Sequence, residues 1–218
     1  MDIKSLWKDY KFPNCETCSH NCQGRLDYDN LCSNLNYLKE YGEKNYIKNK
    51  ESFNELKNIM CNKMPTIFSY GCGLRLGFVC ATEIFGNNIK YYGIDDINWA
   101  IKETDNYKNF EPKLPKTIKF DVGNFLLDGI HENLVICFFN SLFTISNNSE
   151  LDKILFNALK SKNDFYIVCD YTINSNFHMP KEEQDFLNKL ENKLKPKFYF
   201  KHFDILDGRG IIISGKRR

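Results

Sequence analysis

The sequence predicts an α/β fold built on a doubly wound, mainly parallel sheet. Strand-like apolar runs alternate with helix-like segments from about residue 65 onward, a pattern typical of parallel strands with helices on both faces. The last two strand-like runs are joined by Asp207-Gly208-Arg209, so they must form an antiparallel hairpin. The chain has 218 residues, 42% of them hydrophobic, which is enough for a sizeable core.

The first predicted strand, residues 66–70, is followed at once by a glycine turn. Gly71 and Gly73 lie between this strand and a predicted helix over residues 74–85. Glycine reaches backbone angles that other residues resist, and its missing side chain lets a ligand lie against the main chain. The turn therefore suits a nucleotide-like ligand, although a plain strand-to-helix connection would also explain the glycines.

The second predicted strand, residues 89–96, ends in two carboxylates. Asp95 follows Gly73 by about 20 residues, the distance at which an acid after the second strand accepts ribose hydroxyls. Asp95 or Asp96 could instead cap the next helix. Because the glycine turn and the acid each follow a strand, we expect them to form one nucleoside pocket at the carboxyl edge of the sheet.

The later strands and helices follow the same alternation. Residues 134–139 and 165–169 are apolar without alternation, as strands buried on both faces should be. The other predicted strands are 117–120, 197–203 and 210–214, and the other predicted helices are 97–107, 151–159 and 182–194.

The N-terminal region, residues 1–62, is predicted to be a cysteine-rich and helical cap, and residues 63–218 the sheet domain. From about residue 31 to residue 60 the sequence is polar, with apolar residues at helical intervals. This pattern predicts two helices that are interrupted near Gly42.

Four of the nine cysteines lie close together in the N-terminal region. The first two are separated by two residues, and such a turn lets two thiolates converge on one metal ion. Zinc would suit this site, an iron-sulfur cluster would fit cysteine ligands equally well, and a metal-free loop with buried thiols is the alternative. The predicted ligands are Cys15, Cys18, Cys22 and Cys32.

Composition and charge narrow the possible partners and the compartment. The net charge of +2 arises from 30 basic and 28 acidic residues, so nothing in the overall charge argues for a nucleic acid. No apolar run has the length of a membrane span or the form of a signal peptide. We therefore expect a cytoplasmic protein without a membrane partner. The sequence sets no oligomeric state.

Several motifs follow one another in a characteristic order from about Pro65 to the C-terminus. They are Ile67-Phe68-Ser69-Tyr70-Gly71-Cys72-Gly73, Gly93-Ile94-Asp95, Phe120-Asp121-Val122-Gly123-Asn124 and the terminal hairpin. In this order they resemble the class I, Rossmann-like S-adenosylmethionine-dependent methyltransferases. The resemblance implies a seven-stranded sheet of order 3-2-1-4-5-7-6, with strand 7 antiparallel, and S-adenosylmethionine as the cofactor.

The resemblance also implies which residues contact the cofactor. They are Ser69, Tyr70, Gly71, Gly73, Asp95, Asp96, Asp121, Asn124 and Phe139. Family members usually carry an acid where Ser69 stands, often a third glycine where Arg75 stands, and commonly an acid where Asn124 stands. Arg75 would place a cation near the sulfonium unless its side chain points outward.

The resemblance places the methyl acceptor near the fourth and fifth strands. Asn140 follows the fourth strand, and the candidate general bases are Asp170, Tyr171 and His131. Residues 139–143 lack the Asn-Pro-Pro-Tyr motif of nucleic-acid amino methyltransferases. A small molecule or a protein side chain is therefore favoured as the methyl acceptor, with a nucleic acid as the third possibility. The alternative function is a non-catalytic methyltransferase-like scaffold that carries a metal-bound recognition module.

Overall fold

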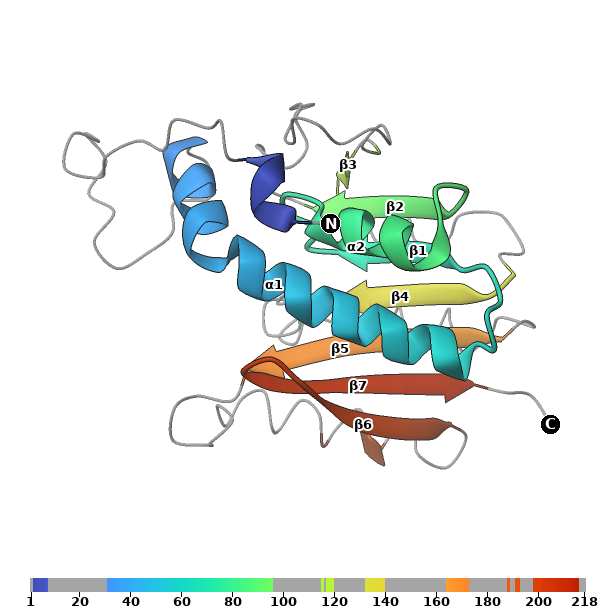
Figure 1. Cartoon of the computed structure of the whole chain (residues 1–218). Coiled ribbons are helices and arrows are strands. Elements are labelled where there is room, and N and C mark those ends of the chain that lie inside the picture. The colour runs from blue at the N-terminus through green and yellow to red at the C-terminus, as the bar shows by residue number, and fades with distance from the viewer. Residues whose placement is uncertain are drawn as a thin grey trace.

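A computed structural model of the chain describes residues 2–7, 31–95, 115, 117–119, 132–139, 164–172, 188, 191–192 and 198–215 (Figure 1). A short 3-10 helix, η1 (Ile3–Leu6), precedes α1 (Leu31–Ile59), β1 (Thr66–Tyr70), α2 (Leu76–Phe85), β2 (Lys90–Asp95), β3 (Thr117–Lys119), β4 (Leu134–Phe138), β5 (Phe165–Thr172), β6 (Tyr199–Ile205) and β7 (Gly208–Gly215). Among these residues, no helix is both long and apolar enough to cross a membrane.

The strands form one sheet of seven, in the order β3-β2-β1-β4-β5-β7-β6. Strands β1 to β5 run parallel, whereas β7 is antiparallel to both of its neighbours, β5 and β6. This is the expected strand order. The hairpin turn lies one residue earlier than predicted: Ile205 pairs with Gly208, and Asp207 between them has a positive φ of 55°.

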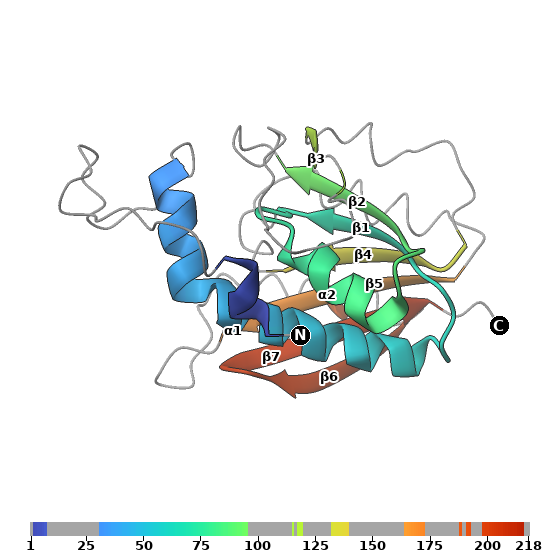
Figure 2. The same cartoon turned by 45° about the horizontal axis from the view of Figure 1, so that its top comes forward.

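Both faces of the sheet are buried. Helices α1 and α2 lie side by side on one face in both views (Figures 1 and 2), and Phe53, Leu56 and Val79 of these helices pack there in one core with sheet residues. On the other face Phe68, Ile136 and Ile167 are almost fully buried as well. The predicted helices 97–107 and 151–159 lie outside the described residues, as does most of 182–194.

Helix α1 is a single element of 29 residues, so the prediction of two helices interrupted near Gly42 is wrong. The helix axis nevertheless bends sharply partway along α1 (Figure 2). The glycine is explained by a side chain that is distant in sequence. A Cβ atom at Gly42 would lie 3.1 Å from two ring atoms of Trp7, which packs in the same core as Leu38. The glycine therefore gives the indole ring room against the helix instead of ending it.

The second half of α1 belongs to the core of the sheet domain. Phe53 and Leu56 are completely buried and pack in the same cluster as Ile67 of β1 and Val135 of β4. The helical part of the predicted cap therefore shares its core with the sheet. The predicted domain boundary between residues 62 and 63 also separates the cysteine-rich stretch from the sheet domain. Most of that stretch lies outside the described residues, so the boundary stays a prediction.

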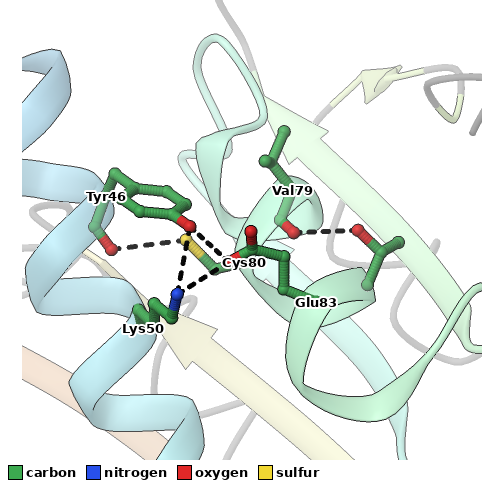
Figure 3. Close-up of polar contacts among 6 residues, drawn as sticks. Tyr46, Lys50, Val79, Cys80 and Glu83 are labelled. Carbon is green, nitrogen blue, oxygen red and sulfur yellow. Dashed lines mark hydrogen bonds and ion pairs between the residues drawn. The ribbon is translucent and has the colours of Figure 1, made fainter. Parts of the chain in front are cut away.

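A polar network joins α1 to α2 beside this core (Figure 3). The Tyr46 hydroxyl donates a hydrogen bond to Glu83, and Lys50 Nζ lies 3.0 Å from Glu83 Oε2. Cys80 Sγ donates to the Tyr46 carbonyl oxygen at 3.4 Å. Burial raises the pKa of Glu83, but the hydrogen bonds from Tyr46 and Lys50 outweigh this effect, so the net pKa is below the ordinary value of 4.5.

We expect Tyr46→Phe to destabilise the protein at pH 7 by about 1 kcal/mol, because the hydroxyl loses its hydrogen bond to the partly buried Glu83 carboxylate and the one it accepts from Lys50 Nζ at 3.3 Å. A carboxyl group whose pKa is lower in the folded state stabilises the fold above its unfolded pKa, and this stability is lost as the pH falls through the folded pKa. The difference between wild type and variant should therefore shrink below about pH 4.

Urea unfolding at several pH values measures this difference. Tyr199→Phe is the control, because Tyr199 is 65% exposed. An equal destabilisation by Tyr46→Phe at pH 7 and at low pH would show that the Glu83 contact contributes nothing.

Candidate functional site

The glycine turn after β1 has the backbone geometry that its residues predict. Gly71 has a φ of 63° and Gly73 a φ of 48°, both in the left-handed region that favours glycine. The turn is held from two sides: Cys72 N–H donates to the Ile94 carbonyl oxygen of β2 at 3.2 Å, and Arg75 N–H donates to the Cys72 carbonyl oxygen at 2.8 Å. The conformational need for glycine is confirmed, while contact with a ligand stays a prediction.

Asp95 is brought directly against this turn. Its Oδ2 atom accepts a hydrogen bond from Gly73 N–H at 2.8 Å, and the residue is only 4% exposed. The glycine turn and the acid thus lie in one place, as predicted from their positions after neighbouring strands. A carboxylate can accept several hydrogen bonds, so holding the turn is compatible with accepting ribose hydroxyls.

The side chain of Arg75 extends away from this place. Its Nη1 atom donates to the Pro115 carbonyl oxygen at 3.1 Å, and the residue is 2% exposed. Asp95 pairs with Lys119 at the end of β3, whereas Pro115 lies before the beginning of β3. The guanidinium group therefore lies several residues away from the carboxyl edge of the sheet. The expected conflict between this cation and a sulfonium is therefore removed.

The backbone of Arg75 accounts for the glycine that the resemblance leads us to expect at this position. Arg75 precedes α2 with a φ of 62° and a ψ of 28°, in the left-handed region. Glycine adopts these angles without steric cost, whereas an arginine does so with some strain. The predicted helix over 74–85 accordingly begins two residues later, at Leu76.

Gly77 is a site residue that the sequence analysis missed. A Cβ atom at Gly77 would lie 2.8 Å from the hydroxyl oxygen of Tyr91, so the first turn of α2 packs against β2 more closely than any side chain would allow. Close packing of helix on strand is the role of the third glycine in nucleotide-binding turns. The signal was present in the spacing of Gly71, Gly73 and Gly77.

Three further residues predicted to contact a cofactor are buried at or beside the ends of β1 and β4. Ser69 is 2% exposed, and the ring of Tyr70 stacks on Phe138 with 5.5 Å between centroids. The ring of Phe139 lies edge-on to Phe53 of α1, with 5.2 Å between centroids. The structure thus shows how these three residues pack. Their contact with a cofactor stays a prediction.

The remaining predicted residues are only partly covered by the structure. Asp170 lies near the end of β5, is 2% exposed and pairs with Gly210 of β7. Tyr171 is described only as backbone of β5. Residues Asp96, Asp121, Asn124, His131 and Asn140 lie outside the described residues.

Two groups account for seven of the nine cysteines, and Cys61 and Cys72 belong to neither group. Cys80, Cys137 and Cys169 are completely buried, as predicted for core residues, and burial raises the pKa of each thiol. Of the predicted metal ligands, Cys32 lies in α1 and is described only as backbone, whereas Cys15, Cys18 and Cys22 lie outside the described residues. No group of three or more metal-binding side chains occurs within the described ranges, and the metal site stays a prediction.

Solved methyltransferase structures resemble this fold. The plantazolicin methyltransferase BpumL in complex with SAH matches with a TM-score of 0.55 and 16% identity, over 84% of this chain and 88% of that one. BpumL with a pentazolic desmethylPZN analogue and SAH gives a TM-score of 0.56 and 15% identity, with 84% and 89% covered. A Staphylococcus aureus protein provisionally assigned as a caffeoyl-CoA O-methyltransferase gives 0.50 and 15%, with 83% and 91% covered.

Comparison by sequence, unlike comparison by structure, finds no similar protein. The sequence matches no protein-family model and no curated protein. At these low identities the structural likeness concerns the backbone arrangement, which is the strand order and the antiparallel β7 described above. The chain therefore has the class I, Rossmann-like fold of these methyltransferases.

The close approach at Gly77 can be tested by a double-mutant cycle with Tyr91. We expect Gly77→Ala alone to cost about 1–3 kcal/mol of stability, because the new methyl group overlaps the Tyr91 hydroxyl. In the Tyr91→Phe background the same change should be neutral or stabilising, since the oxygen is gone and alanine favours the helix.

Chemical unfolding of the wild type, both single variants and the double variant gives the coupling energy between the two positions. Equal costs of Gly77→Ala in both backgrounds would contradict this account of the helix–strand contact.

Proposed function

We propose that the chain is an S-adenosylmethionine-dependent methyltransferase. The observation that carries the proposal is the hydrogen bond from Gly73 N–H to Asp95 Oδ2, which joins a glycine turn and an acid at the carboxyl edge of a sheet with this strand order. Ligands of open α/β sheets bind outside the carboxyl ends of the strands, where the order reverses. In this sheet the reversal lies between β1 and β4, beside the glycine turn.

The described residues fit the proposed cofactor. Asp95 provides the carboxylate for ribose hydroxyls, the main chain at Gly71 and Gly73 is free of side chains, and Arg75 is directed away from the edge. We propose that Ser69, Tyr70 and Phe139 complete the site from the described strands, and Asp96, Asp121 and Asn124 from outside the described residues.

The protein contributes mainly binding and orientation to such a reaction. When bound, S-adenosylmethionine supplies a methyl group that is already activated by the sulfonium. The residues of the chain then align the acceptor and exclude water, which is where most of the rate enhancement comes from. The buried edge formed by Ser69, Tyr70 and Phe139 suits the exclusion of water.

The acceptor side is proposed to lie at the ends of β4 and β5. Asp170 is a carboxylate buried near the end of β5, and it would accept the proton of a hydroxyl or amine acceptor, with Tyr171 and Asn140 orienting that group. A small molecule or a protein side chain is favoured as acceptor over a nucleic acid. The pentazolic desmethylPZN analogue bound by BpumL is an acceptor analogue other than a nucleic acid, which agrees with this preference.

The replacement of Asp95 tests the cofactor site. We expect Asp95→Ala to weaken SAH binding by roughly 10- to 100-fold, the loss that follows from removing charge-assisted hydrogen bonds. Asp95→Asn retains an oxygen that can accept from Gly73 N–H, so it should keep the melting temperature of the wild type while still losing affinity. Asp204→Ala is the control, because the Asp204 side chain is 92% exposed.

Calorimetric titration of SAH into these variants gives the affinities, and thermal melts give the stabilities. Wild-type affinity in Asp95→Ala would reject the proposed pocket. Tight SAH binding without methyl transfer to any acceptor would favour the alternative function, a non-catalytic scaffold. The observation in favour of this alternative is Ser69, which is buried where the resemblance leads us to expect an acid.

We further propose that residues 1–62 act as a cap and that Cys15, Cys18, Cys22 and Cys32 hold zinc or an iron-sulfur cluster. The support is their close spacing in the sequence. Elemental analysis should find about one zinc ion or one iron cluster per chain. The double variant Cys15→Ala/Cys18→Ala should lose it, while Cys61→Ala, which removes an exposed cysteine outside the group, should retain it. Metal-free wild-type protein would contradict the proposal.

A further inference from the structure

Helix α1 carries a row of buried polar side chains where a helix that packs on a sheet normally carries apolar ones. Asn45, Asn49 and Ser52 follow one another at intervals of four and three residues, so they share one face of the helix. They are 8%, 4% and 0% exposed. Further along the same side, Leu56 and Met60 are apolar. The buried side of α1 therefore changes from polar to apolar along its length.

The polar row lies at the carboxyl edge of the sheet. Lys44 Nζ is 3.4 Å from Asp207 Oδ2, and Glu51 Oε2 accepts a hydrogen bond from Leu206 N–H at 2.8 Å. Leu206 and Asp207 form the turn before Gly208, which pairs with Thr172 at the end of β5. In Figure 1 the arrowheads of β4 and β5 point toward the side on which α1 begins.

Two atoms of the row are buried without a partner. Within the part of the chain that the structure describes, neither Asn49 Oδ1 nor Ser52 Oγ has a hydrogen-bond partner, and both atoms are shielded from solvent. A buried polar group without a partner destabilises a protein, and apolar side chains of similar size would avoid this cost. The two oxygens without a partner therefore need an explanation. Their location at the carboxyl edge of the sheet favours a bound ligand as their partner.

Asp170 of β5 faces the same side of the sheet as the polar row. Tyr166 and Val168 belong to the core beneath α1, and strand alternation directs Asp170 to the same face. Phe138 of β4 pairs with Cys169, so Phe139 and Asp170 are the next neighbours across β4 and β5. The ring of Phe139 in turn contacts Phe53, which directly follows Ser52. A carboxylate and an aromatic edge therefore lie on the side that the row faces.

We propose that Asn49 and Ser52 bind the amino-acid end of S-adenosylmethionine, an inference that rests on the function proposed above. Asn49 Oδ1 can only accept, so the ligand must offer a hydrogen-bond donor there, whereas the Ser52 hydroxyl both donates and accepts. An α-ammonium group offers three donors, and the neighbouring carboxylate accepts. With the ribose at Asp95 of β2 and the glycine turn after β1, the amino-acid end is directed toward β4, the next strand in the order. Asp170 adds a negative charge on that side, and Lys48, which is 6% exposed on the same face of α1, adds a positive charge that the carboxylate of the amino-acid end can meet.

Because these oxygens are closed to solvent, a ligand reaches them only when α1 shifts on the sheet. The part of α1 before Asn49 makes exposed ion pairs such as Lys44–Asp207 and Lys4–Glu43, which add little stability. The same part also contributes Leu38 and Tyr46 to the apolar core, and Phe53 and Leu56 anchor the part that follows. A shift that admits a ligand therefore separates apolar as well as polar contacts.

The test compares two ligands that differ only at the proposed contact. SAH carries the amino-acid end, whereas 5′-methylthioadenosine has the same nucleoside and sulfur and ends in a methyl group. We expect Asn49→Ala to weaken SAH binding about tenfold or more, and Ser52→Ala to act in the same direction, with the affinity for 5′-methylthioadenosine unchanged within about twofold. Asn54→Ala, an exposed asparagine on the same helix, should change neither affinity.

Calorimetry of both ligands separates failure of this inference from failure of the proposed function. If the wild type binds both ligands and the variants lose neither, or lose both equally, the assignment of Asn49 and Ser52 is overturned while the methyltransferase proposal stands. If the wild type binds neither ligand, both proposals fail. Unchanged 5′-methylthioadenosine binding shows that a variant is folded, and Ser52→Ala should melt no lower than the wild type because it removes an unpartnered hydroxyl.

Discussion

The hydrogen bond between Gly73 N–H and Asp95 Oδ2 is the contact on which the candidate site depends. It joins the turn after β1 to the end of β2, and a second bond from Cys72 N–H to the Ile94 carbonyl oxygen joins the same two segments. Gly71, Gly73 and Arg75 all adopt a left-handed backbone in this turn, which glycine reaches without steric cost. The turn is thus shaped before any ligand arrives, which lowers the cost of binding.

The second determinant of the site is α1, whose buried side changes in character along the helix. Phe53 and Leu56 complete the core and are stabilised by apolar burial. Asn49 and Ser52, just before them in the chain, border the carboxyl edge, and one side-chain oxygen of each has no partner in the described part of the chain. Natural proteins commonly give up stability at places where a ligand binds, and α1 combines a stable anchor with such a place.

The strand runs and the glycine turn could be predicted because local sequence determines them. Apolar runs without alternation specify buried parallel strands, and glycine followed by an acid after the next strand specifies one edge site. The sequence predicted a helix break at Gly42 because the residue that requires a glycine there cannot be recognised locally. That residue is Trp7, whose ring packs against Gly42 from 35 positions earlier in the chain. Likewise, the direction of the Arg75 side chain depends on Pro115, and the need for Gly77 depends on Tyr91. No local pattern contains such tertiary contacts.

A crystal structure of the protein grown with SAH tests the central claim most directly, because it locates the ligand and the two determinants together. We expect the ribose hydroxyls on the Asp95 carboxylate, the thioether beside Gly71 and Gly73, and the amino-acid end between β4 and residues 49–52 of α1. A structure in which SAH is absent at saturating concentration, or lies away from the carboxyl ends of β1 and β2, would contradict it.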